Sequence, residues 1–452
     1  MSDQATLPDE TRSAGDPQSG PSEAICWVVA ACPDEPDRIG EVLLVPCGQS
    51  RPPRVFGRGA AQPDDPHPRV LLVRQRPEGN RATPALALAR VSRVQLELRG
   101  RPDGRAVDVT NVGRCALLVN GAPTTAASVQ PGDVVELGRQ IAFLCVRRPE
   151  WLDDVESGFA DAPFGVADAF GMVGESAAIW RVRRTVAFAA AQPGHVLVTG
   201  PSGAGKELVA RAVHSLSRRA RGPFVARSAA TLPAGLIDAE LFGNARNYPN
   251  PGMPERAGLV GQAAGGTLFL DEIGELSEEL QAHLLRVLDA GEYQRLGDGT
   301  TRVADFRLVG ATNRPLERLK HDLLARFTLR AELPGLEDRR EDIPLLARHL
   351  LRRLAAGNPT LATRFFAGGT PRGEPRLSLP LVRHLLQIPY PTNTRDLERQ
   401  LLMAIERSRA ESLEGPPSPG DALLAEAPTG HAGPVAAAPG DAQHLSAERV
   451  QA

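Results

Sequence analysis

The chain of 452 residues has room for two or three domains, and its formal net charge of −2 gives no overall signature of nucleic-acid binding. No apolar run approaches the ~18 residues of a membrane span, and the polar, acidic N-terminus lacks the basic and apolar regions of a signal peptide. The five cysteines have no CxxC spacing and the nine histidines no ligand spacing, which argues against a zinc or disulfide framework and indicates buried, reduced thiols. We expect a cytoplasmic protein that contacts no membrane.

The first third of the chain predicts an all-β domain that follows a disordered tail. Residues 1–21 are rich in proline, glycine and polar residues and are assigned to the tail. Within 22–147, Val94, Leu96 and Leu98 alternate with polar residues, which is the period of a half-buried strand. Short strands and Gly/Pro turns continue through ALLVNGAP and PGDVVELG, a pattern typical of a β-sandwich.

The order FGRG, VSRVQ, LLVNG, PGDVVELG in this region resembles an FHA domain, a family that binds phosphothreonine peptides. The resemblance implies that Arg58, Ser92 and Arg93 contact the phosphopeptide, and arginine forks and hydroxyl groups suit phosphate oxygens. Gln95 stands where the family has His, and Cys115 where it has a peptide-contacting Asn. Two uses stay open: binding of a phosphothreonine protein or a kinase, or a retained fold that serves only protein contacts or packing.

A linker is predicted at 148–170, and the stretch HVLVTGPSGAGKELVARAVHSL then predicts an apolar strand, a glycine-rich turn and an amphipathic helix. The turn fits the G-x4-G-K pattern of a Walker A loop, whose backbone N–H groups cradle phosphates while its lysine reaches the terminal ones. Glu207 stands where Ser or Thr normally ligates Mg²⁺. The predicted ATP-binding residues are Gly200, Pro201, Ser202, Gly203, Ala204, Gly205, Lys206 and Glu207.

Two further apolar strands end in polar residues. GTLFLDE ends in Asp271, placed to hold Mg²⁺ through water, and in Glu272, placed to polarise the attacking water. FRLVGATN ends in Thr312 and Asn313, placed to sense a γ-phosphate. Because the carboxyl ends of parallel strands meet at one edge of a sheet, the sequence predicts a single site there for ATP and Mg²⁺.

Residues 171 to about 408 resemble the AAA+ domain of sigma-54-dependent transcriptional activators, through GPSGAGKE, AELFG, GGTLFLDEIGELS, LLRVLDAGEYQRLG, ATNRPL and LPGLEDRREDI in that order. The resemblance implies an α/β core at 171–345 and a helical lid at 346–409. It also implies ATP hydrolysis by a hexameric or heptameric ring that acts on sigma-54 RNA polymerase. The glutamate after the Walker lysine is the residue that this family carries.

The same resemblance assigns the other site residues. Arg395, in YPTNTRDLERQ, matches the sensor II arginine of the lid, while Lys320 and Arg326 match the two arginine fingers that complete a neighbouring subunit's site. Lys320 keeps the charge of an arginine but loses its bidentate fork, so slower hydrolysis is expected. Ser228 replaces the asparagine that couples the Walker B glutamate to remodelling, which leaves that coupling in question.

NYPNPG, residues 247–252, occupies the position of the GAFTGA loop, through which the family contacts sigma-54. Pro249 and Pro251 each fix φ and remove a donor, and no Phe-Thr tip remains. We expect a rigid surface turn without sigma-54 contact; the alternative is that Tyr248 replaces the aromatic tip. Residues 410–452 have a composition that buries no core and are expected to be a disordered tail, without the helix-turn-helix of the family and without direct DNA binding.

The sequence thus predicts a multidomain chain, with an FHA-like β-sandwich, a P-loop α/β AAA+ domain with a helical lid, and disordered tails. The leading function is an ATP-hydrolysing transcriptional regulator of the sigma-54 activator type, controlled through the FHA-like domain. The alternative is a nucleotide-gated scaffold that has lost sigma-54 contact and acts on another partner. A P-loop protein of unrelated transport or repair function is disfavoured by the ordered run of motifs.

Overall fold

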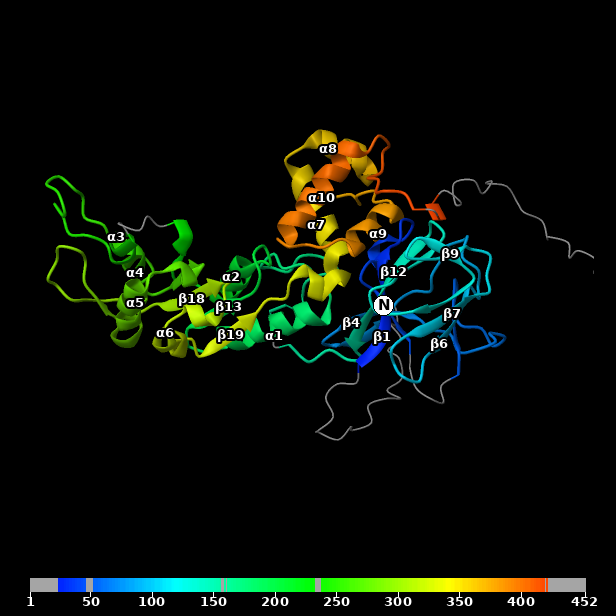
Figure 1. Ribbon diagram of the computed structural model, residues 1–452, viewed down its shortest axis with the longest axis horizontal. Helices are drawn as coiled ribbons and strands as arrows, with labels where there is room; N and C mark the ends of the chain where they lie inside the picture. The colour runs from blue at the N-terminus through cyan, green and yellow to red at the C-terminus, as the bar shows by residue number, and fades with distance from the viewer. Residues whose placement is uncertain are drawn as a thin grey trace, which may run out of the picture.

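The computed structural model describes residues 23–45, 52–155, 158–159, 161–231, 237–418 and 420–421. Within these ranges the chain forms an N-terminal β-domain, a central α/β domain and a C-terminal helical bundle (Figure 1). The N-terminal tail expected at 1–21 and most of the tail expected at 410–452 fall outside them. In the part of the chain that is described, no helix has the length and apolarity needed to cross a bilayer.

The β-domain consists of two sheets whose named strands all pair antiparallel. One sheet has the order β5-β4-β2-β1-β12-β11-β8-β9 and the other β10-β7-β6-β3. A short 3₁₀ turn, η1 (Pro36–Arg38), follows β1. The strands are β1 (Glu23–Ala31), β2 (Val42–Val45), β3 (Arg54–Phe56), β4 (Leu72–Arg76), β5 (Gly79–Ala82), β6 (Leu96–Gly100), β7 (Val107–Asn111), β8 (Leu117–Val119), β9 (Ala122–Thr124), β10 (Ala126–Val129), β11 (Val134–Leu137) and β12 (Ile141–Pro149).

Aromatic rings hold the two sheets of the β-domain together. Phe143 of one sheet lies edge-on to Phe56 of the other, with ring centroids 5.5 Å apart, and Trp27 lies 5.8 Å from the same ring. Side chains from both sheets form one buried cluster, as expected for a sandwich. The all-β prediction for this region is therefore confirmed.

One detail of the predicted alternation is wrong. The expected strand begins at Leu96, so Val94 is half-buried and Gln95, expected on the outer face, is completely buried. An amide is tolerated there because all of its hydrogen-bonding capacity is used, as described below.

The α/β domain contains a five-stranded parallel sheet in the order β14-β15-β18-β13-β19. Helices α1 and α2 cover one face, and α3 to α6 cover the other, so the three inner strands of the sheet are buried on both sides. Its strands are β13 (Val196–Thr199), β14 (Phe224–Ser228), β15 (Thr267–Asp271), β18 (Arg307–Thr312) and β19 (Leu329–Glu332). Its helices are α1 (Ala177–Ala191), α2 (Lys206–Leu216), α3 (Ile237–Phe242), α4 (Gly258–Gln262), α5 (Glu278–Ala290) and α6 (His321–Arg326).

Short elements complete the central domain. A two-stranded hairpin, β16 (Glu292–Tyr293) and β17 (Arg302–Val303), projects beyond α5. The 3₁₀ turns are η2 (Ala229–Thr231), η3 (Ile273–Glu275), η4 (Leu316–Arg318) and η5 (Leu336–Asp342), the last of which leads directly into the helical bundle.

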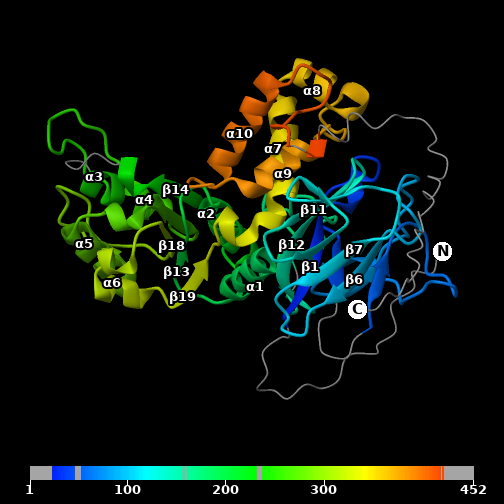
Figure 2. The same ribbon diagram turned by 45° about the vertical axis from the view of Figure 1, so that its right-hand side comes forward.

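The helical bundle consists of α7 (Ile343–Ala356), α8 (Pro359–Phe365), the 3₁₀ turn η6 (Ala367–Gly369), α9 (Leu379–Gln387) and α10 (Thr394–Arg407). It lies over the junction of the other two parts, with α9 next to β12 in both views (Figures 1 and 2). After α10 the chain continues in extended form across the bundle, where Leu413 is completely buried. The part of the expected tail that is described, 410–418 and 420–421, is therefore packed on the protein.

Candidate nucleotide site

The strand order brings the three polar strand ends to one edge of the central sheet. β13, which leads into the Walker A loop, lies beside β18, and β18 lies beside β15. The backbone N–H of Gly200 donates to the carbonyl of Thr312 at 3.3 Å, which joins the loop to the end of β18. The predicted convergence of these motifs is thus present in the fold.

Glycine makes the conformation of the Walker A loop possible. Gly200, Gly203 and Gly205 have φ of +149°, +77° and +106°, which L side chains rarely adopt. At Gly203 a Cβ would lie 2.3 Å from the carbonyl oxygen of Thr392, so the bundle approaches the loop closely. Within the described residues, the backbone amides of residues 202, 203 and 205 donate to no acceptor. Such amides at a helix N-terminus suit an anionic ligand.

Lys206 lies between this loop and the two carboxylates of Asp271 and Glu272. The side chain is 7% exposed, and its Nζ donates to the carbonyl of Gly200 at 3.2 Å and lies 3.9 Å from Glu272 Oε1. Glu272 also accepts a 3.4 Å bond from the N–H of Asn313, and its own N–H donates to Asp271 Oδ1 at 3.0 Å. One ammonium and two carboxylates therefore lie together beside the donor loop.

Two predicted residues have other neighbours. Glu207 is half-exposed and pairs with Arg211, one turn along α2, at 2.7 Å. Thr312 is buried at the end of β18, where its hydroxyl accepts from the N–H of Arg314 at 3.0 Å. The register of β14 against β15 places Ser228 opposite Asp271.

The helical bundle contacts the Walker A loop directly. Asn393 donates Nδ2 to the carbonyl of Ser202 at 2.9 Å, and Thr394 donates its hydroxyl to the carbonyl of Gly203 at 2.7 Å. Arg395 lies over the same loop, with Nη1 3.3 Å from Ser202 Oγ. Of these, only Arg395 was predicted; Asn393 and Thr394 are its neighbours in YPTNTRDLERQ and were missed because carbonyl contacts leave no pattern in a sequence.

Lys320 and Arg326 lie apart from this cluster, and their partners belong to α5. The Lys320 ammonium is 3.8 Å from Glu278, and its backbone N–H donates to Gln281. Arg326 is half-exposed and pairs with Asp289, and this hydrogen bond lowers the pKa of the Asp289 carboxyl.

The NYPNPG segment is held by internal hydrogen bonds. Asn247, at φ +66°, donates its N–H to Met253 O at 2.9 Å and accepts from the N–H of Gly252 at 3.0 Å. Below the loop, the buried Asn244 donates Nδ2 to the carbonyls of Ala245 and Pro254 at 2.9 and 3.0 Å.

The ring of Tyr248 in this segment packs on Gly297 of the β16–β17 connection, where a Cβ would lie 2.3 Å from the ring. A backbone bond from Ala245 to Leu296 joins the same two segments. The loop and the hairpin thus form one projecting unit.

The candidate phosphopeptide residues of the β-domain also come together. The N–H of Arg58 donates to the carbonyl of Ser92 at 3.0 Å, its Nε donates to Val91 O, and both Arg58 and Arg93 are exposed. The Ser92 hydroxyl accepts from the N–H of Arg114 at 3.0 Å, which leaves its own proton available to donate.

Gln95 fixes these loops from within. Its Oε1 accepts from the N–H groups of Ser92 and Cys115, and its Nε2 donates to Asn111 Oδ1 at 2.7 Å and to Cys115 O at 2.8 Å. The amide therefore ties the Ser92 loop to the Cys115 loop, although the sequence showed it only as a departure from the FHA pattern. Burial raises the pKa of the Cys115 thiol to about 11, so the thiol is neutral.

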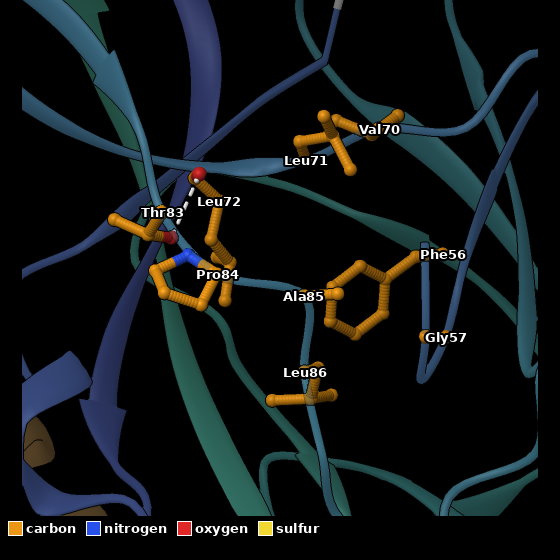
Figure 3. Close-up of a pocket in the computed structure, with 10 residues that line it drawn as sticks. Phe56, Gly57, Val70, Leu71, Leu72, Thr83, Pro84, Ala85 and Leu86 are labelled. Atoms are coloured by element: carbon orange, nitrogen blue, oxygen red, sulfur yellow. Dashed lines mark hydrogen bonds between the residues drawn. The ribbon is translucent and has the colours of Figure 1, made fainter. Parts of the chain in front are cut away.

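A small pocket elsewhere in the β-domain has less chemistry to offer (Figure 3). It lies between Phe56 and the segment from Thr83 to Leu86, and the Thr83 hydroxyl donates to Leu72 O at 2.9 Å. No charged side chain lines it, so it supplies no means of holding a phosphate.

Residues 172–333 match the family model described as Sigma-54 interaction domain. This stretch is a Sigma-54 interaction domain. Such domains are AAA+ P-loop NTPases, and the loop, the carboxylate pair and the parallel sheet described above are the parts that this chemistry requires.

Several known proteins resemble this part of the chain. The transcriptional regulatory protein ZraR of Salmonella typhimurium is 40% identical over 256 residues, which cover 55% of this chain and 54% of ZraR. The DNA-binding transcriptional regulator NtrC of Rhizobium meliloti is 40% identical over 235 residues, covering 50% and 46%. The crystal structure of NtrX from Brucella abortus in complex with ADP has 32% identity and a TM-score of 0.47, covering 56% of this chain and 54% of that one. The chain spans about half the length of the curated relatives that it matches.

Proposed function

We propose that this protein is an ATP-binding and ATP-hydrolysing AAA+ regulator of transcription, of the sigma-54 activator type, controlled through its FHA-like β-domain. The observation that supports it most is the meeting of Lys206, Asp271 and Glu272 beside the Walker A loop, whose amides at 202, 203 and 205 have no acceptor in the part of the chain that the structure describes. The family match of the central domain supports the same reading.

Each group has a role in this proposal. The loop amides and Lys206 bind the phosphates of ATP, and the bundle acts as a lid over the nucleotide, a role that the contact of Arg395 with Ser202 supports. Glu272 accepts a proton from the attacking water, whose oxygen bonds to the γ-phosphorus while the bond to the β-phosphate oxygen breaks. Asp271 would hold Mg²⁺ through water, and the ion would neutralise charge on the phosphates.

Nucleotide binding is the first test. Full-length protein is titrated with a fluorescent ADP analogue, and Lys206→Ala is expected to abolish binding while Glu272→Gln binds and does not hydrolyse ATP. Arg211→Ala, on the exposed side of the same helix, is the matched control and is expected to bind normally. Binding that survives Lys206→Ala would contradict the site.

The partner is tested separately by sedimentation with sigma-54 and ADP–aluminium fluoride. Rings that carry sigma-54 would support the activator function. Rings without sigma-54 would support the alternative, a nucleotide-gated scaffold that acts on another partner. The internal bonding of the NYPNPG segment is the observation that favours this alternative, because the N–H groups of Asn247, Tyr248 and Gly252 donate within the protein and the tyrosine ring packs on Gly297.

The FHA-like site is tested with a library of phosphothreonine peptides. Arg58→Ala and Ser92→Ala are expected to weaken binding at least tenfold, because each removes a donor to phosphate. Arg81→Ala, which removes an exposed arginine from strand β5, is the charge-matched control. If all three variants bind the peptides equally well, Arg58 and Ser92 do not bind phosphate, and the domain serves only packing or protein contacts.

A further inference from the structure

The helical bundle is packed against the β-domain as well as against the nucleotide site. A single apolar cluster includes Ala30 and Leu144 of the β-domain together with Leu345, Leu381 and Leu385 of the bundle. Figure 2 shows α9 beside β11 and β12, two inner strands of the eight-stranded sheet. The β-domain is thus joined to the bundle by a core and not only by a linker.

A buried ion pair lies in this junction. Arg383 of α9 is 4% exposed and donates Nη1 to Glu136 Oε1 of β11 at 2.5 Å, while Glu136 is 1% exposed. Burial raises the pKa of the Glu136 carboxyl, and the Arg383 guanidinium opposes the shift. Breaking such a pair leaves a buried charge without a partner, so the junction resists separation.

The segment that follows α10 closes the same junction from outside. Arg383 also pairs with Asp421, and Ser418 donates its hydroxyl to the carbonyl of Gly121, at the turn between β8 and β9, at 3.2 Å. Leu413 is fully buried and exchanges backbone bonds with Arg376 and Ser378. The β-domain, the bundle and the C-terminal segment therefore meet at one arginine.

The connection from Arg383 to the Walker A loop is short. Tyr390, 2% exposed, donates its hydroxyl to Leu385 O at 2.6 Å, which fixes the turn between α9 and α10. That turn carries Asn393, whose Oδ1 accepts from the N–H of Leu336 at 2.7 Å while its Nδ2 donates to Ser202. Displacement of α9 would move the residues that touch the nucleotide loop.

We propose that Glu136 of the β-domain is a positioning residue for the nucleotide site: through Arg383 it sets the place of the bundle on the Walker A loop, and Asp421 supports the same arginine. This inference rests on the proposed function only in taking the Walker A loop to bind nucleotide. Because coupling between sites is reciprocal, nucleotide at the loop then stabilises the junction, and whatever alters the junction alters nucleotide affinity.

The test uses full-length protein and measures two quantities, the Kd of a fluorescent ADP analogue and hydrogen exchange with and without ADP. Glu136→Gln, Arg383→Met and their combination are each expected to raise the Kd about tenfold. The double variant should be no worse than either single one, because both remove the same pair. Arg353→Met, which breaks an exposed pair with Glu398 inside the bundle, is the matched control and should leave the Kd unchanged.

Hydrogen exchange separates positioning from a merely structural role. In the native protein, saturating ADP is expected to slow exchange at 117–122 and 134–137, in the β-domain, as well as in the loop. In Glu136→Gln and in the milder Asp421→Asn, saturating ADP should still slow exchange in the Walker A loop. It should no longer slow exchange at 117–122 and 134–137. An unchanged Kd in the variants, or β-domain protection that persists in them, would overturn the inference. Native protein that binds no ADP would instead overturn the proposed function and this inference with it.

Discussion

Arg326 is held by Asp289 of its own chain, with Nη2 3.0 Å from Oδ2, and not by the nucleotide loop of its own chain. Both side chains are roughly half-exposed, so the pair opens into solvent. An arginine held in this way remains free to exchange its carboxylate for the phosphates of a neighbouring subunit. This arrangement fits an arginine finger that acts in trans.

Replacing Arg326 by alanine is therefore expected to leave the Kd for ADP unchanged and to lower ATP turnover by at least about a hundredfold, since a finger contributes about 10³–10⁵ in rate. Steady-state phosphate release measures the effect. Arg318→Ala, an exposed arginine of η4, serves as control. Normal turnover in Arg326→Ala would exclude the finger role.

Lys320→Arg is expected to raise ATP turnover. The substitution keeps the positive charge next to Glu278 and adds the planar fork that binds phosphate oxygens in two places. The increase should be about tenfold or more and should appear only at protein concentrations where subunits assemble. A fall in turnover would mean that the lysine is itself adapted to this site.

Asn393→Ala should weaken ADP binding about tenfold or more, because it leaves the carbonyl of Ser202 and the N–H of Leu336 without their partners. Titration with a fluorescent ADP analogue measures it. Asn358→Ala removes the N-cap of α8 in the same bundle and controls for lost bundle stability. If both variants bind ADP equally well, the contact with Ser202 has no role in binding.

The buried His195 is expected to make the protein less stable in acid. Burial, with Arg307 and Arg219 nearby, lowers the pKa of its imidazole to about 4, while its Nδ1 accepts from the N–H of Leu308 at 3.0 Å. Between pH 6.5 and 4 the unfolded chain then binds more protons than the folded protein. The free energy of unfolding therefore falls as the pH falls through that window. Chemical unfolding at pH 7, 6 and 5 measures it.

The variant His195→Asn keeps an acceptor for Leu308 and removes the titrating group. Its free energy of unfolding should change less steeply with pH than that of the native protein, by the equivalent of up to one bound proton. His67→Asn, in a loop of the β-domain, should keep the native dependence. Parallel pH curves for all three proteins would contradict the assignment.

Asn244→Ala should release the NYPNPG segment. The variant loses the amide that binds the carbonyls of Ala245, Tyr248 and Pro254, so amides at 245–256 are expected to exchange about tenfold faster or more. Nucleotide affinity should not change. Asn250→Ala, exposed in the same loop, is the control. Native exchange rates in Asn244→Ala would show that the Asn244 amide does not hold the loop.

The sequence by itself determined the parts whose signal is local. Alternation of apolar residues indicated the β-domain, and glycine spacing with strand ends in Asp271 and Thr312 indicated a nucleotide site at one sheet edge. The β-domain and the meeting of the strand ends could be predicted because backbone preferences and burial act on neighbours in the chain. The alternation failed at Gln95, where four side-chain hydrogen bonds, three of them with the distant Asn111 and Cys115, outweigh the cost of burying an amide.

Only the tertiary structure decided how the parts meet. The contact of Asn393 with Ser202 joins residues far apart in the chain, and so do the ion pairs of Arg383 with Glu136 and Asp421. Such contacts form no sequence motif, since any polar residue with the right reach can pair once the fold brings it close. The same holds for Tyr248 on Gly297. Local sequence fixes which atoms can donate, accept or carry charge. Packing of whole domains decides which of them meet, because burial removes water as the competing partner.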